Sequence, residues 1–152
     1  MSLHILTQIF FKKMKQDQKI LLLGYSGLIP FLAIPILSFF FEDNRQIFLQ
    51  FFVVYSLGIY TFLTGNLWSM SINQQKEPIY PILLFFLPWI LMIPIGLYTT
   101  PYISSILALV FSFLTAYLYE KSLFDQILFY KQMRFRLTMI VIICHLIFLI
   151  SI

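Results

Sequence analysis

Long runs of apolar residues, separated by short polar segments, dominate the pattern along the chain, and five of these runs contain no Asp, Glu, Lys or Arg. A helix needs about 20 apolar residues to cross a hydrocarbon core of about 30 Å, and in lipid it satisfies its own backbone hydrogen bonds. The pattern therefore predicts an all-α integral membrane bundle of five transmembrane helices. The predicted spans are residues 20–41, 47–70, 79–98, 101–119 and 134–152.

The last span contains the shortest apolar run, residues 137–152. At about 1.5 Å per residue, this run alone is shorter than the hydrocarbon core. We therefore extend the predicted helix back to Arg134, with Arg134 and Arg136 reaching the interface. The preceding connection, over residues 120–136, is the longest in the chain, and apolar residues at helical spacing within it predict a surface helix.

Four prolines lie inside the predicted first and third spans. Each removes an intrahelical hydrogen bond, so these two helices should be bent or locally open. Breaks of this kind line substrate sites in transporters, but prolines are also frequent in membrane helices that only pack. The four are Pro30, Pro35, Pro88 and Pro94.

The composition supports a membrane protein with one folded domain. Hydrophobic residues make up 61% of the chain and charged residues 11%, whereas an average soluble domain is about 25% charged. A chain of 152 residues has too little polar surface to cover five helices that are apolar on all sides. We expect a basic arm over residues 1–19, either an interfacial helix or disordered, and a transmembrane domain over residues 20–152.

Lysine and arginine are distributed unevenly between the two sides of the predicted bundle. Of the ten in the chain, nine lie on the side of the amino terminus, and Arg45 is alone on the other. The positive-inside rule then places the amino terminus in the cytoplasm. Because these charges flank apolar spans, we expect them to face lipid headgroups, and we expect no nucleic-acid partner.

Small residues at helical spacing mark the faces on which membrane helices pack. The second and fourth spans each carry such a stripe, and we expect both stripes to face the interior of the bundle as packing seams. The stripe on the second span is Tyr55, Gly58, Phe62, Gly65 and Ser69, and that on the fourth is Ser105, Ala108, Ser112, Thr115 and Tyr119.

Polar and aromatic residues gather toward the cytoplasmic ends of three predicted spans. Asn66, Trp68 and Ser69 lie on the second span, Tyr25 lies on the first, and Arg134 begins the fifth. Such a group over a basic edge is suited to hold a lipid headgroup or a quinone ring. The alternative is structural: an aromatic belt together with hydrogen bonds that join helices.

His145 lies deep in the last span. An ionisable residue in a membrane is a functional hypothesis, but a proton relay needs a chain of such groups, and we expect no Asp or Glu at this depth. We therefore expect a buried, neutral His145 that is hydrogen-bonded to a neighbouring helix. Metal binding is not expected, because the adjacent Cys144 points about 100° away around the helix and two further ligands are missing.

Four segments of the chain are more distinctive than the rest: residues 24–31 (GYSGLIPF), 62–68 (FLTGNLW), 87–89 (LPW) and 130–138 (YKQMRFRLT). Together they resemble an uncharacterised family of small multi-span proteins of bacterial inner membranes and mitochondria that includes transmembrane protein 69. The resemblance implies a five-helix fold and a location in the bacterial inner (plasma) membrane, or in the inner mitochondrial membrane of a eukaryote. This family places His before the tryptophan and Gly after it, where this chain has Leu67 and Ser69, so no role of that histidine is implied here.

These patterns favour a protein that is not an enzyme and has no cofactor. The sequence offers no nucleophile with a base, no paired carboxylates and no metal cluster, and such groups are needed for catalysis. We expect an accessory or assembly subunit of a membrane complex, in contact with the lipid bilayer and with other membrane subunits. The alternatives are a small transporter or channel, which broken helices permit, and a protein that binds a lipid or a quinone.

Overall fold

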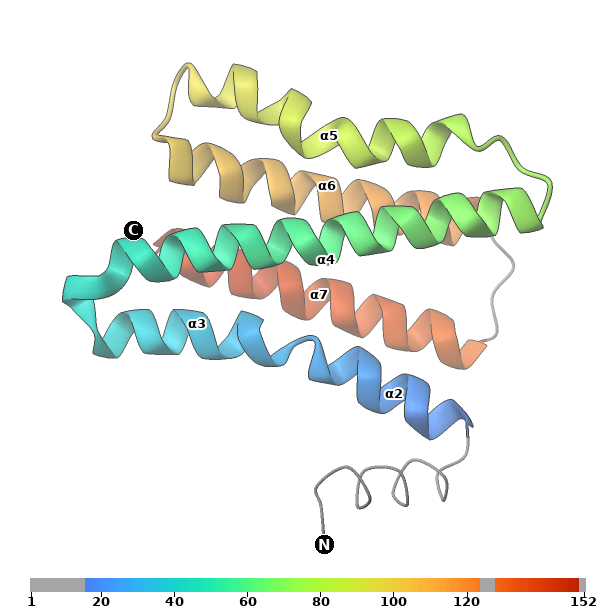
Figure 1. Ribbon diagram of the computed structural model, residues 1–152, viewed down its shortest axis with the longest axis horizontal. Helices are drawn as coiled ribbons and strands as arrows, with labels where there is room; N and C mark the ends of the chain where they lie inside the picture. Colours follow the sequence, from blue (N-terminus) through green and yellow to red (C-terminus); the bar gives the residue numbers. More distant parts are fainter. Residues whose placement is uncertain (1–15, 124–127, 151–152) are drawn as a thin grey trace, which may run out of the picture.

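The computed structural model of the chain describes residues 16–123 and 128–150, and within these ranges it contains helices and no strand. The long helices run along a common axis (Figure 1). The predicted all-helical bundle is confirmed. Its elements are α2 (Gln16–Ser26), α3 (Ile29–Phe40), the short 3-10 helix η1 (Glu42–Asn44), α4 (Arg45–Asn73), α5 (Ile79–Gly96), α6 (Pro101–Leu123) and α7 (Leu128–Ile150).

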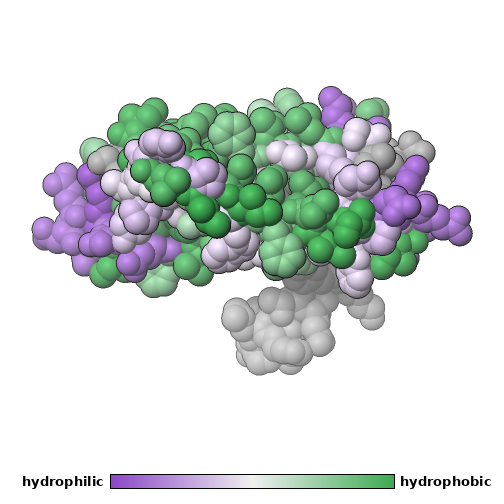
Figure 2. All heavy atoms as spheres, turned by 90° about the horizontal axis from the view of Figure 1, so that it is seen from above, coloured by the Kyte–Doolittle hydropathy of each residue, from purple (hydrophilic) through white to green (hydrophobic). Residues whose placement is uncertain are grey.

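Five helical segments of the described chain are long and apolar enough to cross a membrane. The first is formed by α2 and α3 together, and residues 16 and 150 lie at opposite ends of the bundle, as five crossings require (Figure 1). The apolar surface forms a broad middle zone with hydrophilic residues at both ends (Figure 2). This distribution is the one expected of a protein embedded in a bilayer. The segments are Gln18–Phe40, Glu42–Asn73, Ile79–Gly96, Pro101–Ser122 and Leu128–Ile150.

The connection between the last two spans differs from the prediction. The helix α6 continues to Leu123 and α7 begins at Leu128, so residues 120–123 and 128–133, predicted to lie in the connection, belong to the two spanning helices. Glu120 is predicted to lie in the connection and Arg134 to reach the interface, but the two charges pair with each other and are buried inside the bundle. Residues 124–127 of the predicted surface helix, and residues 1–15 of the predicted arm, lie outside the described chain.

The helix α4 is central to the packing. It contacts α3, α5 and α6, while α7 contacts α6, α3 and α2. The interior is aromatic: Phe31 of α3 packs edge-on against Phe52 of α4 and Phe113 of α6. Within the first span, α3 packs against α4 and α7, whereas α2 packs chiefly against α7 and is held less closely than α3.

Four of the five residues in the stripe predicted on the second span do not face the interior, and the fifth, Tyr55, is half-buried. Gly58, Phe62, Gly65 and Ser69 are exposed, because α4 presents a different face to three neighbouring helices. The buried residues of α4 are Leu49, Phe52, Ser56, Tyr60, Thr64, Leu67 and Ser71. On α6 the prediction is largely correct, since Ser105, Ala108 and Ser112 are buried, whereas Thr115 is exposed and Tyr119 half-buried.

Two tyrosines of α4 compensate for the backbone breaks in its neighbours. The first span breaks between α2 and α3, just before Pro30, and the Tyr55 hydroxyl donates to the Gly27 carbonyl at 2.8 Å. In α5, Pro88 lacks the N–H that would bond the carbonyl of the residue four positions earlier. The Tyr60 hydroxyl donates to that carbonyl, of Leu84, at 2.6 Å. Neighbouring side chains thus satisfy groups that lipid cannot.

Candidate functional site

A cleft of about 450 Å³ lies between the first span, α4 and α7. Its inner end is apolar, where Phe31 of α3 meets Phe113 of α6 and Val141 of α7. Its outer end, toward the start of α7, carries Asn66 of α4 and Arg134 of α7. The cleft therefore changes from apolar to polar along its length, as an amphiphilic molecule does.

Two glycines line the cleft on the side of the first span, and their surroundings differ. Gly24 and Gly27, on either side of the end of α2, both line it and contribute no side chain. A Cβ atom on Gly24 would lie 3.3 Å from side-chain atoms of Leu137 and Met133. A Cβ atom on Gly27 would meet only carbonyl oxygens of its own segment within 4 Å. The position of Gly27 thus borders free space.

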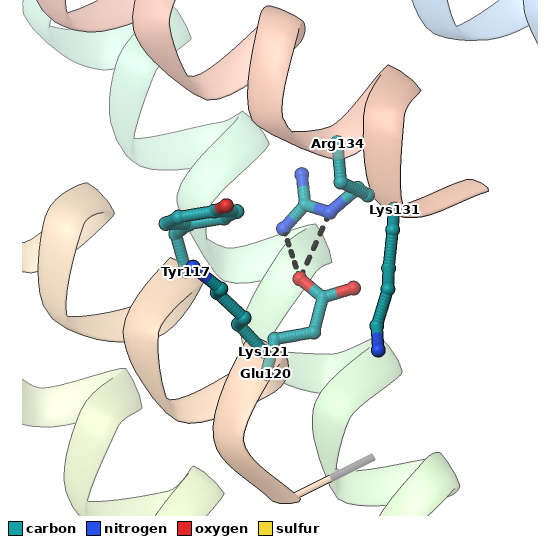
Figure 3. Close-up of a pocket in the computed structure, with 5 residues that line it drawn as sticks. All are labelled: Tyr117, Glu120, Lys121, Lys131 and Arg134. Atoms are coloured by element: carbon teal, nitrogen blue, oxygen red, sulfur yellow. Dashed lines mark hydrogen bonds and ion pairs between the residues drawn. The ribbon is translucent and has the colours of Figure 1, made fainter. Parts of the chain in front are cut away.

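The polar end is fixed by a buried ion pair. The Arg134 Nε and Nη2 atoms both donate to the Glu120 Oε2 atom, at 2.8 and 2.5 Å (Figure 3). Both residues are buried, with 7% of Arg134 and 3% of Glu120 exposed. Tyr130 hydrogen-bonds Glu120 as well. This network joins the last turn of α6 to the second turn of α7 and holds the guanidinium beside the cleft.

A second, smaller cavity adjoins the ion pair and shares Arg134 with the cleft. It measures about 50 Å³ and is lined by Tyr117, Glu120, Lys121, Lys131 and Arg134 (Figure 3). Both lysines are exposed. Three cationic side chains and one carboxylate leave two positive charges in excess where the polar end of the cleft meets the surface.

The structure divides the predicted polar cluster. Asn66 and Arg134 line the cleft together, as the sequence suggested. Trp68 instead lines a cavity of about 260 Å³ between α4 and α5, because residues two apart on a helix point about 200° apart. Ser69 is exposed, and Tyr25 is half-buried against the core.

Sequence reasoning missed Glu120 as a site residue. Its signal lies in spacing: Glu120 and Arg134 are 14 positions apart and equidistant from residue 127. A tight antiparallel turn between two helices therefore places these opposite charges side by side. This relation is not apparent if the segment between the two residues is predicted to be a long connection.

His145 is fully buried, as predicted, but its hydrogen bond is to its own helix. The Nδ1 atom lies 2.8 Å from the Val141 carbonyl oxygen, and because a carbonyl only accepts, Nδ1 carries the hydrogen. Among the described residues Nε2 has no hydrogen-bond partner. Aromatic rings of three neighbouring helices, those of Phe31, Phe52 and Phe113, pack against the imidazole with centroids at 4.7 to 5.7 Å.

Comparison with known proteins identifies a family that the chain matches but does not indicate an activity. Residues 16–150 match the model of a family described as "Protein of unknown function (DUF3429)". No curated protein and no solved structure matches the chain. The matched range begins at the first residue of α2 and ends at the last residue of α7.

Proposed function

The chain belongs to this family of proteins of unknown function, and we propose that it is a non-enzymatic membrane protein that holds a membrane amphiphile in the cleft between its first span, α4 and α7. The cleft is the observation on which this proposal rests. It combines a largely apolar wall with one polar end, where the ion pair holds Arg134 in place. Ligand sites are typically apolar cavities with a few placed polar groups.

The hydroxyl groups of the spans support a binding role over transport. Ser56, Thr64 and Ser112 are buried at the centre of the bundle, and each donates to a carbonyl of its own helix. Ser71 and Ser105 do the same nearer the two ends. Hydroxyl groups bound in this way do not line a polar path through the membrane, which a channel or transporter needs. We therefore rank transport behind amphiphile binding.

The broader role that we propose is that of an accessory or assembly subunit of a membrane complex, in contact with lipid and with other membrane subunits. The resemblance to the family that includes transmembrane protein 69 supports a bacterial inner membrane or an inner mitochondrial membrane. The start of α2, the α4–α5 connection, the end of α6 and the start of α7 lie at one end of the bundle (Figure 1). The lysine and arginine bias supports a cytoplasmic location for this end.

Filling the cleft should expel the amphiphile. In Gly27→Leu a side chain enters the cleft where no other helix lies within 4 Å of the new Cβ atom, so the bundle should fold as before. We expect native mass spectrometry of the protein, purified in mild detergent, to show that this variant has lost at least about nine-tenths of the lipid or quinone bound to the wild type. The same preparation is extracted with solvent to identify the molecule released.

Gly58→Leu is the matched control. Gly58 lies on an exposed face of α4, and a Cβ atom there has no neighbour within 4 Å. This variant adds the same side chain to a spanning helix but leaves the cleft open, so it should keep the occupancy of the wild type. Equal occupancy in both variants, or a wild type that carries no amphiphile, would contradict the proposed function.

A further inference from the structure

The charges around Arg134 identify the class of amphiphile. Building on the proposed function, we propose that the cleft takes an anionic phospholipid, with one acyl chain along the apolar wall and the phosphate beside Arg134, Lys121 and Lys131. The two cavities that share Arg134 supply the two halves of this site. The larger is apolar for most of its length, and the smaller is bordered by the lysines.

The ion pair leaves positive charge available to a ligand. Glu120 engages Arg134 through Nε and Nη2 only, and the third guanidinium nitrogen points away from the carboxylate (Figure 3). The side chains of Lys121 and Lys131 lie on either side of the pair and are exposed (Figure 3). A single carboxylate therefore faces three cations, and a phosphate at this place would complement their excess charge.

The size of the smaller cavity places the phosphate at its mouth. A volume of about 50 Å³ has room for only a few water molecules, so the headgroup stays at the surface of the bundle while its oxygen atoms reach the cations. A neutral quinone ring would draw no benefit from the excess charge. Basic side chains near a membrane surface attract anionic lipids, by about fivefold in affinity for each lysine.

Competition between two phospholipids tests the inference. The full-length protein, depleted of lipid in detergent, is mixed with equimolar phosphatidylglycerol and phosphatidylcholine of identical acyl chains, and native mass spectrometry counts each adduct. We expect phosphatidylglycerol to be favoured in the wild type. In Lys121→Gln/Lys131→Gln this preference should fall by about fivefold for each lysine removed, while total lipid occupancy persists through the apolar wall.

Lys76→Gln is the control for net charge. Lys76 is exposed in the connection after α4, at the same end of the bundle, and is not among the residues that line the cleft or the smaller cavity. The Lys76→Gln variant should keep the wild-type preference for phosphatidylglycerol over phosphatidylcholine. A preference that survives the double substitution, or equal binding of both lipids by the wild type, overturns the inference.

A quinone offered in a third arm separates this inference from the proposed function. A wild-type cleft that takes the quinone and excludes phosphatidylglycerol overturns the anionic-lipid assignment but leaves amphiphile binding intact. A protein that takes neither lipid nor quinone overturns both. Binding of phosphatidylglycerol that weakens as salt is raised supports the inference, because salt screens charges at a surface.

Discussion

Glu120→Gln is expected to destabilise the protein by about 3–5 kcal/mol, because it leaves the Arg134 guanidinium buried without its counter-charge. The carboxylate accepts two hydrogen bonds from Arg134 in a site where both residues are nearly inaccessible to solvent. An unpaired charge within a membrane helix is also costly. Thermal unfolding in detergent without added lipid, followed by size-exclusion chromatography of the soluble fraction, measures the loss.

A double variant shows whether the loss comes from the pair. Glu120→Leu combined with Arg134→Met removes both charges and keeps similar side-chain volume, so it should be much more stable than either single variant. Glu77→Gln, at an exposed glutamate after α4, should unfold like the wild type. If the losses of stability caused by the two single substitutions simply add in the double variant, the two charges do not stabilise each other.

Tyr60→Phe is expected to cost about 1–2 kcal/mol, since it leaves the Leu84 carbonyl without a donor. The phenol is buried in the bundle, and its hydroxyl is the group that compensates for the N–H missing at Pro88. The same unfolding measurement applies. Tyr98→Phe is the control, because Tyr98 is 89% exposed at the end of α5.

Restoring the backbone donor provides a sharper test of this mechanism. Pro88→Ala returns an N–H that can bond the Leu84 carbonyl within α5. We therefore expect Pro88→Ala to offset part of the loss when it is added to Tyr60→Phe, and to have a smaller benefit when Tyr60 is present. Equal effects of Pro88→Ala in both backgrounds would mean that the tyrosine and the proline act independently.

The fold could be predicted from the sequence because lipid imposes one strong condition. Uncharged apolar runs must be helices there, and short polar turns make consecutive helices antiparallel. The same reasoning failed at the stripe of α4. Gly58 and Gly65 suggest close packing, but the helices that surround α4 determine which of its faces is buried. The Tyr60 hydroxyl binds the Leu84 carbonyl of another helix, and this contact depends on the tertiary structure.

The candidate site could be predicted in part. The sequence groups Asn66 and Arg134 correctly, because the distance of each residue from the end of its span gives its depth in the membrane, and the two depths are similar. The direction in which a side chain points around the helix axis determines whether it also reaches the cleft. Trp68 shares the depth of Asn66 but faces α5. Glu120 was assigned to a loop, since a charge at the end of an apolar run looks the same whether it meets water or a buried arginine.

An experimental structure of the protein in a lipid nanodisc shows whether an amphiphile occupies the cleft beside Arg134. We expect elongated density between Gly27 and Phe31 on one side and Leu137 and Val141 on the other, ending in a headgroup at Arg134. A first span packed down against α4 and α7, with side chains filling the cleft and no such density, would contradict it.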